Sequence, residues 1–257
     1  EVHFFDEYFG KGLDWYSRFF PARPAAEGYR AWGEITPKYL FVPAVADRVA
    51  DTLGPDTRII VILRDPVDRF FSHYRMSYSQ GDTELGPEDF VQTNREAFER
   101  GRYAEQLRRY VDRLGRENIL VLFYEELFST DASGIPESLY EVGNFLGLDN
   151  SLWSGLASGK RIGNEGSAGR PRFVALYTLA KRIRQWCRDR DLEGLVRLVK
   201  RIGVSSRTFG GLRETPDIPE GLEDVLWQAY RNDVADLEEL LGRSIDFWGP
   251  EKRKAAS

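Results

Sequence analysis

Arg58-Ile-Ile-Val-Ile-Leu63 runs directly into Arg64-Asp-Pro-Val-Asp-Arg-Phe-Phe-Ser-His-Tyr74, and this stretch decides the fold. Its first part is a short, continuous, β-branched apolar run, which is typical of a strand covered on both faces in a parallel sheet. Pro66 suits the first turn of a helix. The stretch therefore predicts a buried strand followed by a helix, with Arg64 at the junction.

The same alternation continues along the chain. Asn118-Ile-Leu-Val-Leu-Phe123 predicts a second buried strand. Helical periodicity predicts helices at Pro43–Leu53, Tyr103–Leu114, Ile135–Leu146 and Gly221–Leu241. Strands alternating with helices predict an α/β fold, a central parallel sheet flanked by helices on both faces. Val2-His-Phe-Phe5 is predicted to be a further short strand, and Tyr29–Ile35 another.

The length and composition predict one domain. The chain has 257 residues, 42% of them hydrophobic, which is enough for a sizeable core over residues 1–257. The stretch 173–215 departs from the pattern, with basic amphipathic helices predicted at Phe173–Arg190 and Leu192–Ile202 and a loop at Gly203–Thr215. We interpret it as an excursion from the core whose basic face is solvated or attracts an acidic acceptor or a membrane surface.

Charge and residue counts exclude several classes of function. A net charge of −5 argues against non-specific nucleic-acid binding. The single cysteine, Cys187, permits neither an intramolecular disulfide nor a thiolate cluster, and two histidines, His3 and His73, argue against a multi-histidine metal site. No apolar run reaches the roughly 18–20 residues of a membrane span. We expect no metal, no nucleic-acid partner and no stable membrane span.

The junction of the first strand and helix is a candidate phosphate site. Arg64 lies at the carboxyl end of the predicted strand, where open α/β sheets bind ligands, and Ser72 lies on the second turn of the helix. A guanidinium forks onto phosphate oxygens, and a hydroxyl adds a further donor. The plainer alternative is that Arg64 pairs with Asp65 or Asp68 and that Ser72 is an ordinary helix residue.

Four motifs in chain order carry a resemblance to a known family. They are Glu1-Val-His-Phe-Phe-Asp6, Gly33-Glu-Ile-Thr-Pro-Lys-Tyr39, Arg64-x-Pro66-x-x-Arg69-x-x-Ser72-x-Tyr74 and Ser167-Ala-Gly-Arg-Pro171. The third resembles the 3′-phosphate signature of sulfotransferases that use 3′-phosphoadenosine 5′-phosphosulfate (PAPS). The first two resemble the opening segments of the heparan-sulfate-type branch, and the fourth resembles the loop that closes over the nucleotide. Four motifs in order are a specific signal.

The resemblance implies a fold, a reaction and a set of site residues. The fold is the P-loop-NTPase-like sulfotransferase fold. The reaction is in-line transfer of a sulfuryl group from PAPS to a hydroxyl or amine of a carbohydrate, lipid or small-metabolite acceptor, which leaves adenosine 3′,5′-bisphosphate. The catalytic residues are Glu1, as base, and His3, and the acceptor contacts are Asp6 and Tyr103. The implied nucleotide contacts are Arg64, Ser72, Ser167, Gly169 and Arg170.

Plainer interpretations of these residues stay open at this point. Glu1 is otherwise a terminal charge, His3 a core histidine with a satisfied ring, and Tyr103 a core residue on the apolar face of its helix. The late loop around Arg170 is otherwise a solvated basic loop. Two other functions also stay open, a non-catalytic nucleotide-binding or interaction module and a P-loop nucleotide kinase relative, and the oligomeric state is not predicted.

Three features depart from the family pattern. The family's Gly-rich loop for the 5′-phosphosulfate would precede Glu1, so we expect a longer enzyme with an N-terminal segment before the present sequence. Ile35 stands where much of the heparan-sulfate branch has a lysine linked to the reaction centre. The paired cysteines of secretory-pathway relatives are missing, since Cys187 stands alone, which favours a cytoplasmic enzyme.

Overall fold

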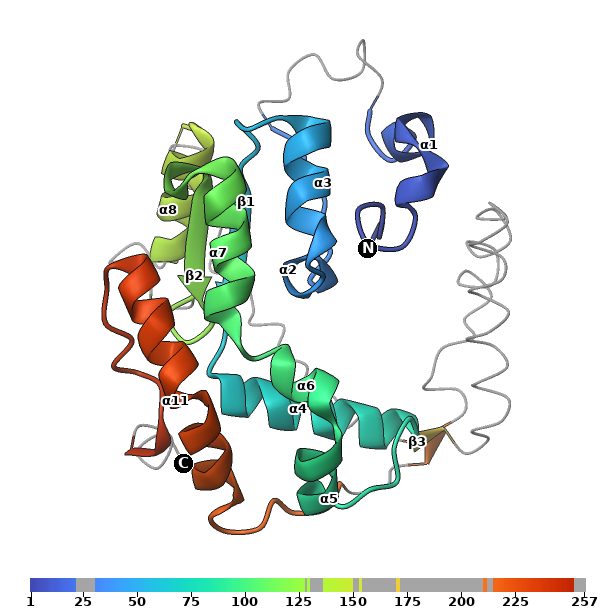
Figure 1. The fold of residues 1–257 in the computed structure, drawn as a ribbon, viewed down its shortest axis with the longest axis vertical. Coiled ribbons are helices and arrows are strands. Elements are labelled where there is room, and N and C mark those ends of the chain that lie inside the picture. Colours follow the sequence, from blue (N-terminus) through green and yellow to red (C-terminus); the bar gives the residue numbers. More distant parts are fainter. Residues whose placement is uncertain are drawn as a thin grey trace. The chain divides into compact units, whose positions relative to one another are not determined.

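A computed structural model describes residues 1–21, 31–127, 129, 136–149, 153, 170–171, 210–211 and 215–251. The chain forms two compact units (Figure 1). The first unit contains residues 1–65, 102–160 and 230–257, and the second contains residues 66–101 and 161–229. The expectation of a single domain over residues 1–257 stays a prediction.

The first unit contains the two predicted buried strands. β1 (Ile59–Leu63) and β2 (Ile119–Phe123) pair in parallel, with Ile59 opposite Ile119 and Leu63 opposite Phe123. Each strand begins one residue after its predicted start. Parallel neighbours need a crossover connection, and the helices between the two strands in sequence provide it. The predicted parallel α/β arrangement is therefore present.

The two strands are covered to different extents. β2 is largely buried, because α7 (Tyr103–Leu114) and α8 (Glu137–Leu146) pack against it. On β1, Val61 and Leu63 are buried, whereas Ile60 is 38% and Ile62 is 56% exposed. The expectation that both strands are covered on both faces is wrong for β1, because Ile60 and Ile62 leave one face partly exposed.

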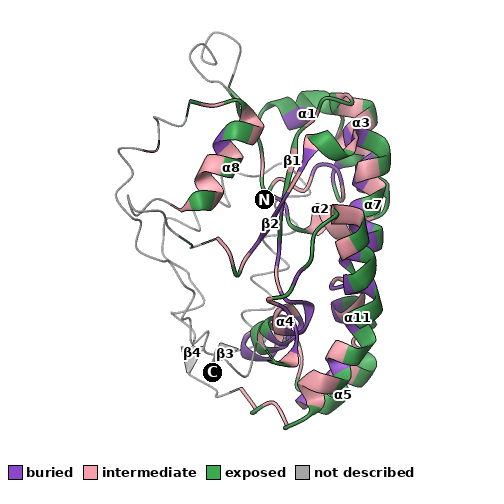
Figure 2. Cartoon of the chain, turned by 90° about the vertical axis from the view of Figure 1, so that its left-hand side faces the viewer, coloured by how far each residue is buried: buried purple, intermediate pink, exposed green. Residues whose placement is uncertain are grey.

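α7 contacts several other elements of the first unit. Its buried face contains Tyr103, Leu107, Tyr110 and Leu114, and Figure 2 shows buried and exposed residues along it. α7 packs against α2 (Lys38–Phe41) and α3 (Ala44–Leu53) as well as against β2. It ends at Gly115, where a φ of 81° suits glycine. The helical periodicity predicts its bounds correctly.

The first residues form a turn in place of the predicted strand. The Glu7 N–H donates to the His3 carbonyl at 3.1 Å. Phe4 and Phe5 are each 1% exposed and pack edge to face, with ring centroids 4.9 Å apart. A strand would send these two side chains to opposite faces. The strand prediction for residues 2–5 is therefore wrong, because one aromatic cluster buries both rings.

The aromatic cluster continues through η1 (Phe9–Lys11), a 3-10 helix, and α1 (Leu13–Ser17). The strand predicted at Tyr29–Ile35 is absent over residues 31–35, the part of it that the structure describes. These residues are mostly exposed, so no buried face supports strand pairing there.

The second unit is built on α4 (Pro66–Gln80), which begins at Pro66 as predicted. Phe70 and Tyr74 of α4 pack on Phe90 of α5 (Pro87–Thr93), and α6 (Arg95–Glu99) lies beside both helices. The backbone of β3 (Arg170–Pro171), paired antiparallel with β4 (Gly210–Gly211), also lies against α4. The helices predicted at 173–190 and 192–202 lie outside the described residues, and β4 falls within the loop predicted at 203–215.

The remaining described elements are η3 (Arg116–Asn118), a 3-10 helix before β2, and α11 (Leu222–Leu241), which the sequence predicts at Gly221–Leu241. After α11, Ile245 and Trp248 are buried. Among the described residues, no helix combines the length and the apolar character that a bilayer crossing requires.

Candidate active site

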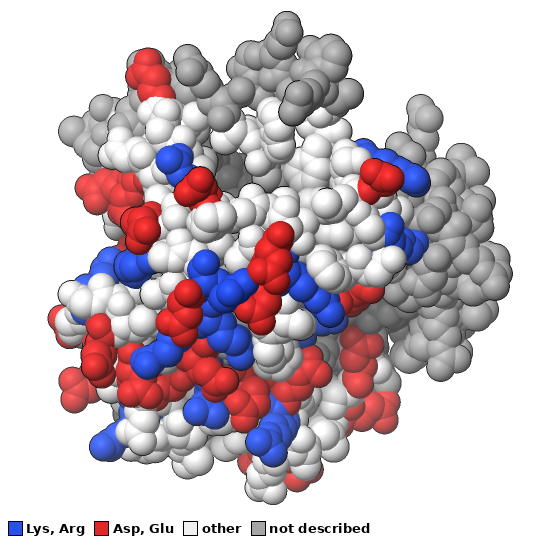
Figure 3. Space-filling model, turned by 45° about the horizontal axis from the view of Figure 1, so that its top comes forward, with Lys and Arg blue, Asp and Glu red and all other residues white. Residues whose placement is uncertain are grey.

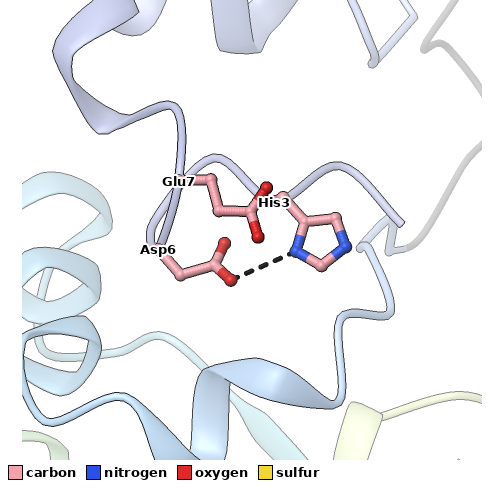
Figure 4. Close-up of side chains that lie close together, drawn as sticks. All are labelled: His3, Asp6 and Glu7. Atoms are coloured by element: carbon pink, nitrogen blue, oxygen red, sulfur yellow. Dashed lines mark hydrogen bonds and ion pairs between the residues drawn. The ribbon is translucent and has the colours of Figure 1, made fainter. Parts of the chain in front are cut away.

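The turn at the start of the chain brings three of the predicted site residues together. His3 Nε2 lies 2.9 Å from Glu1 Oε2, and His3 Nδ1 lies 3.1 Å from Asp6 Oδ2. Figure 4 shows the imidazole and the Asp6 carboxylate facing each other, with Glu7 beside them. The family resemblance assigns these three residues to the site, and a turn, in place of the predicted strand, brings them together.

His3 has a backbone conformation that is unusual for its residue type. Its φ is 59°, and among the described residues no other non-glycine residue has a positive φ. Left-handed backbone costs a non-glycine residue about 1–2 kcal/mol and persists only where the surroundings enforce it. Here the buried aromatic rings that follow hold the turn. The strain lies within the candidate site.

The two carboxylates on the imidazole differ in exposure. The Glu1 side chain is 50% exposed, whereas the Asp6 side chain is 2% exposed. Asp6 Oδ1 is buried and has no hydrogen-bond partner within the described part of the chain. Glu1 is therefore the carboxylate that a ligand can reach. Asp6 is the buried carboxylate that contacts the imidazole through Nδ1.

A lysine that the sequence analysis did not single out completes the group. Lys38, at the start of α2, places Nζ 2.8 Å from Glu7 Oε1 and 3.7 Å from Asp6 Oδ2. His3, Asp6 and Glu7 present possible ligand atoms within 4.8 Å of one another, a set that can hold a metal ion. The Lys38 ammonium lies against the same two carboxylates. Ile35, at the family's lysine position, is 82% exposed.

A buried hydrogen-bond network holds the segment that carries Lys38. The Glu34 carboxylate accepts hydrogen bonds from Tyr16 Oη at 2.8 Å, Tyr39 Oη at 3.0 Å and Thr36 Oγ1 at 3.1 Å. The Phe5 N–H in turn donates to Tyr39 Oη at 3.1 Å. Burial, together with the Glu34 charge, raises the pKa of both tyrosines well above 10, so that they remain protonated donors. This network links the first turn to α2.

Arg48 of α3 supports the first turn from another side. Its Nη1 donates to the Phe5 carbonyl at 2.6 Å, and its guanidinium lies 4.8 Å from the centre of the Phe9 ring. The sequence analysis missed Arg48 because helical periodicity reports only apolar spacing. The Gly33–Tyr39 motif contains Glu34, Lys38 and Tyr39. The motif identifies these residues, but it does not show which partners they contact.

Arg64 is held at the carboxyl end of β1, as predicted. Its carbonyl accepts a hydrogen bond from Tyr103 Oη at 3.0 Å, and its guanidinium lies 5.1 Å from the centre of the Tyr124 ring. Tyr103 is 4% exposed. This burial favours the core interpretation of Tyr103, which then supports the residue predicted to bind phosphate. Asp65 is 3% exposed and accepts a hydrogen bond from the Gly249 N–H at 3.1 Å.

The start of α7, next to Tyr103, is stabilised by a buried carboxylate from α11. The Ala104 N–H, one of the first N–H groups of the helix, donates to Asp233 Oδ2 at 3.3 Å. Burial raises the pKa of Asp233 to about 6, although the hydrogen bonds from Ala104 and Tyr103 partly offset that rise. The protonation state of Asp233 is therefore linked to the start of α7.

The other predicted nucleotide contacts belong to the second unit or lie outside the described residues. Ser72 is exposed on α4, and the backbone of Arg170 lies in β3 against the same helix. Ser167 and Gly169 lie outside the described residues. Because Arg64 and Ser72 belong to different units, their binding of one phosphate stays a prediction.

Two further residues of α4 stabilise the second unit. Arg69 donates from Nη2 to the Ala97 carbonyl, which ties α4 to α6. Burial, followed by the charges of Arg69 and Arg100, lowers the pKa of His73. The partly buried His73 ring has its centroid 6.3 Å from that of the Phe90 ring.

Charged side chains are interspersed on the face drawn in Figure 3. Opposite charges also pair where α3 contacts α7, since Arg113 Nε lies 3.0 Å from Asp47 Oδ1. Exposed pairs of this kind contribute about 0–1 kcal/mol each. Within the described residues on this face, the mixed signs produce no extended field of one sign.

Comparisons with known proteins bear on the family. A family model described as "Sulfotransferase domain" matches residues 10–156. Human heparan sulfate glucosamine 3-O-sulfotransferase 6 is 32% identical over 159 residues, which cover 58% of this chain and 43% of that protein. Membrane-associated sulfotransferase kil1 of Dictyostelium discoideum is 36% identical over 77 residues, covering 30% of this chain and 16% of that protein. The matches thus span less than half the length of these relatives.

A solved structure bears on the fold. The crystal structure of a sulfotransferase from Alicyclobacillus acidocaldarius matches with a TM-score of 0.61 and 23% identity, covering 96% of this chain and 85% of that chain. At this identity the likeness speaks for the fold alone. It confirms the expected α/β sulfotransferase fold.

Proposed function

The chain belongs to the sulfotransferase domain family, and from that premise we propose that it transfers a sulfuryl group from PAPS to a hydroxyl of a carbohydrate-type acceptor, with Glu1 as the base. The observation that carries the proposal is the convergence of Glu1, His3 and Asp6 on a strained turn, with only Glu1 substantially exposed among the three. Relatives named as heparan sulfate glucosamine sulfotransferases support a glycan as the acceptor class.

The proposed reaction needs a base beside the acceptor. Glu1 takes the proton of the acceptor hydroxyl as the acceptor oxygen attacks sulfur, and the bond from sulfur to the 5′-phosphate oxygen breaks in line. The products are the sulfated acceptor, adenosine 3′,5′-bisphosphate and a protonated Glu1, which then releases its proton to solvent. His3 orients the Glu1 carboxylate through its Nε2, and Asp6 orients His3 through Nδ1.

The proposed nucleotide site uses residues at the strand end and on α4. Arg64 suits the 3′-phosphate, because its backbone is fixed by Tyr103 and a guanidinium forks onto phosphate oxygens. Ser72 is exposed on α4 and thus open to a ligand. Arg170, Ser167 and Gly169 complete the proposed set through the family resemblance.

Two variants test the two halves of the proposal separately. Glu1→Gln keeps the size of the side chain but removes the base, so we expect turnover with PAPS and a heparan sulfate oligosaccharide to fall about 10²- to 10⁴-fold. Its affinity for adenosine 3′,5′-bisphosphate, measured by calorimetric titration, should not change. Arg64→Ala should weaken that affinity about tenfold or more. Glu105→Gln, an exposed carboxylate of α7, is the matched control.

Each half fails on its own result. Unchanged nucleotide affinity in Arg64→Ala would show that the strand end does not hold the 3′-phosphate. Undiminished turnover in Glu1→Gln would exclude it as the base. Phosphate transfer from ATP that depends on Mg²⁺, without transfer from PAPS, would identify the protein as a kinase instead.

A further inference from the structure

We propose that Lys38 is a positioning residue of the Glu1 site, acting through Asp6 on His3 and thereby on the Glu1 carboxylate. The proposal rests on the function proposed above. It starts from one atom: Asp6 Oδ2 lies 3.1 Å from His3 Nδ1 and 3.7 Å from Lys38 Nζ. The lysine and the histidine therefore share one carboxylate oxygen, and a change at one is transmitted to the other.

The charges around this oxygen explain why the ammonium matters. Glu1, Asp6 and Glu7 bring three carboxyl groups to the two sides of a single imidazole. Asp6 is 2% exposed, so water screens it little, and a buried carboxylate is retained only with a compensating charge or hydrogen bonds. The Lys38 ammonium lies close enough to the Asp6 carboxylate to provide this compensation, and it also pairs with Glu7 at 2.8 Å.

The compensation has a geometric consequence for the base. With the ammonium beside it, Asp6 stays in its buried position and accepts from His3 Nδ1, which fixes the ring and directs Nε2 to Glu1. Without the ammonium, the Asp6 carboxylate gains from turning toward solvent, and the imidazole loses its support. Glu1 then has no fixed orientation toward an acceptor hydroxyl.

The position of Lys38 also bears on metal binding. The ligand atoms of His3, Asp6 and Glu7 lie within 4.8 Å of one another, as a divalent cation requires, but the ammonium lies against both carboxylates. An ammonium brings the positive charge without needing a metal. We therefore expect added EDTA to leave turnover unchanged and added Mn²⁺ to restore none of the activity lost in Lys38→Met at equal ionic strength.

The main test compares three variants and one control variant of the intact protein with wild type. Lys38→Met removes the charge and keeps the length, and we expect kcat with PAPS and a heparan sulfate oligosaccharide to fall about 10- to 100-fold at unchanged KM for PAPS. Lys38→Arg keeps a cation and should recover at least a third of the wild-type kcat. Glu7→Gln breaks only the Glu7 pair and should lower kcat less than threefold. Lys11→Met is the control for loss of a nearby lysine. The Lys11 Nζ lies 5.1 Å from the centres of the Tyr8 and Trp15 rings.

Two results would overturn the role of Lys38. Unchanged kcat in Lys38→Met would refute it directly. A loss in Glu7→Gln as large as in Lys38→Met would show that the exposed Glu7 pair, and not Asp6, is what matters. If wild type itself transfers no sulfuryl group, the proposed function fails, and the coupling is then decided by a measurement that needs no turnover.

That measurement is the ¹⁵N spectrum of the histidine rings. The chain has two histidines, His3 and His73, so both rings can be assigned, and His73 of α4 serves as an internal control. Lys38→Met should change the His3 Nδ1 signal, because its hydrogen bond to Asp6 changes, and should leave the His73 signals unchanged. Identical His3 signals in wild type and Lys38→Met would refute the coupling whatever the activity.

Discussion

Asp233 of α11 binds the start of α7, next to Tyr103, and its titration should make the stability of the protein depend on pH. Its carboxylate accepts from the Ala104 N–H at the start of α7, and Asp233 is 7% exposed. Burial raises its pKa from 3.8 to about 6. The informative perturbation is Asp233→Asn, which keeps an oxygen to accept from Ala104 but cannot ionise.

The sign and size follow from the linkage between protonation and folding. Because the folded protein holds the Asp233 proton more tightly than the unfolded chain, this group stabilises the fold below pH 3.8, and the contribution is lost as pH rises through about 6. A rise of about two pH units corresponds to a ceiling of about 3 kcal/mol. Partial access of water to the carboxylate lowers this to about 1–2 kcal/mol.

The assay is urea unfolding of wild type and Asp233→Asn at several pH values from 4 to 7. The free energy of unfolding of wild type should fall relative to that of the variant by about 1–2 kcal/mol across this range. Asp236→Asn, one turn along on the exposed face of α11, is the matched control; removing its charge should lower the pKa of Asp233 only slightly. Parallel curves for wild type and Asp233→Asn would refute the assigned pKa and its cause.

Three further predictions concern backbone groups that the sequence cannot show. Tyr103→Phe removes the donor to the Arg64 carbonyl, so we expect a loss of about 1–3 kcal/mol in urea unfolding and a several-fold weaker affinity for adenosine 3′,5′-bisphosphate by calorimetry. Tyr110→Phe removes the donor to the Tyr39 carbonyl at 2.7 Å and should cost similar stability but leave that affinity unchanged; equal affinities in both variants would contradict the support of Arg64 by Tyr103. Gly115→Ala, at a φ of 81° after α7, should destabilise by about 1–3 kcal/mol, and no change in unfolding would show that the backbone there relaxes freely.

The elements that the sequence predicts best are those whose burial repeats regularly. α7 and α11 bury every third or fourth residue, and both strands are continuous apolar runs, so their bounds agree with the prediction within one residue. The prediction of full cover fails for Ile60 and Ile62, because an apolar run shows which side chains favour burial and not whether a neighbouring element covers them. Whether the second face of a strand is buried depends on which other elements pack against it, and the strand's own sequence does not contain that information.

The sequence predicts which residues form the candidate site, but it does not predict how the backbone arranges them. Glu1, His3 and Asp6 were assigned through the family resemblance, and the structure brings them together, yet through a left-handed turn in place of a strand. The adjacent rings of Phe4 and Phe5 pack into one aromatic cluster, which a strand would not allow because it sends neighbouring side chains to opposite faces. At sites of this kind the backbone conformation often differs from the one that the local sequence favours. The conformation persists here because it brings the functional side chains together.

The Ile35 position concerns the arrangement of charge in the candidate site. By position in the motif, the isoleucine indicates that the reaction centre has lost a cation. In the structure Ile35 is 82% exposed, while the ammonium of Lys38, three residues later, lies 3.7 Å from the buried Asp6 carboxylate. A long flexible side chain can deliver its charge from a neighbouring turn, and the carboxylate responds to where the charge is and not to which residue supplies it. The departure at Ile35 therefore removes a residue type from one position without removing the positive charge from the site, and Lys38→Met is the substitution that would remove it.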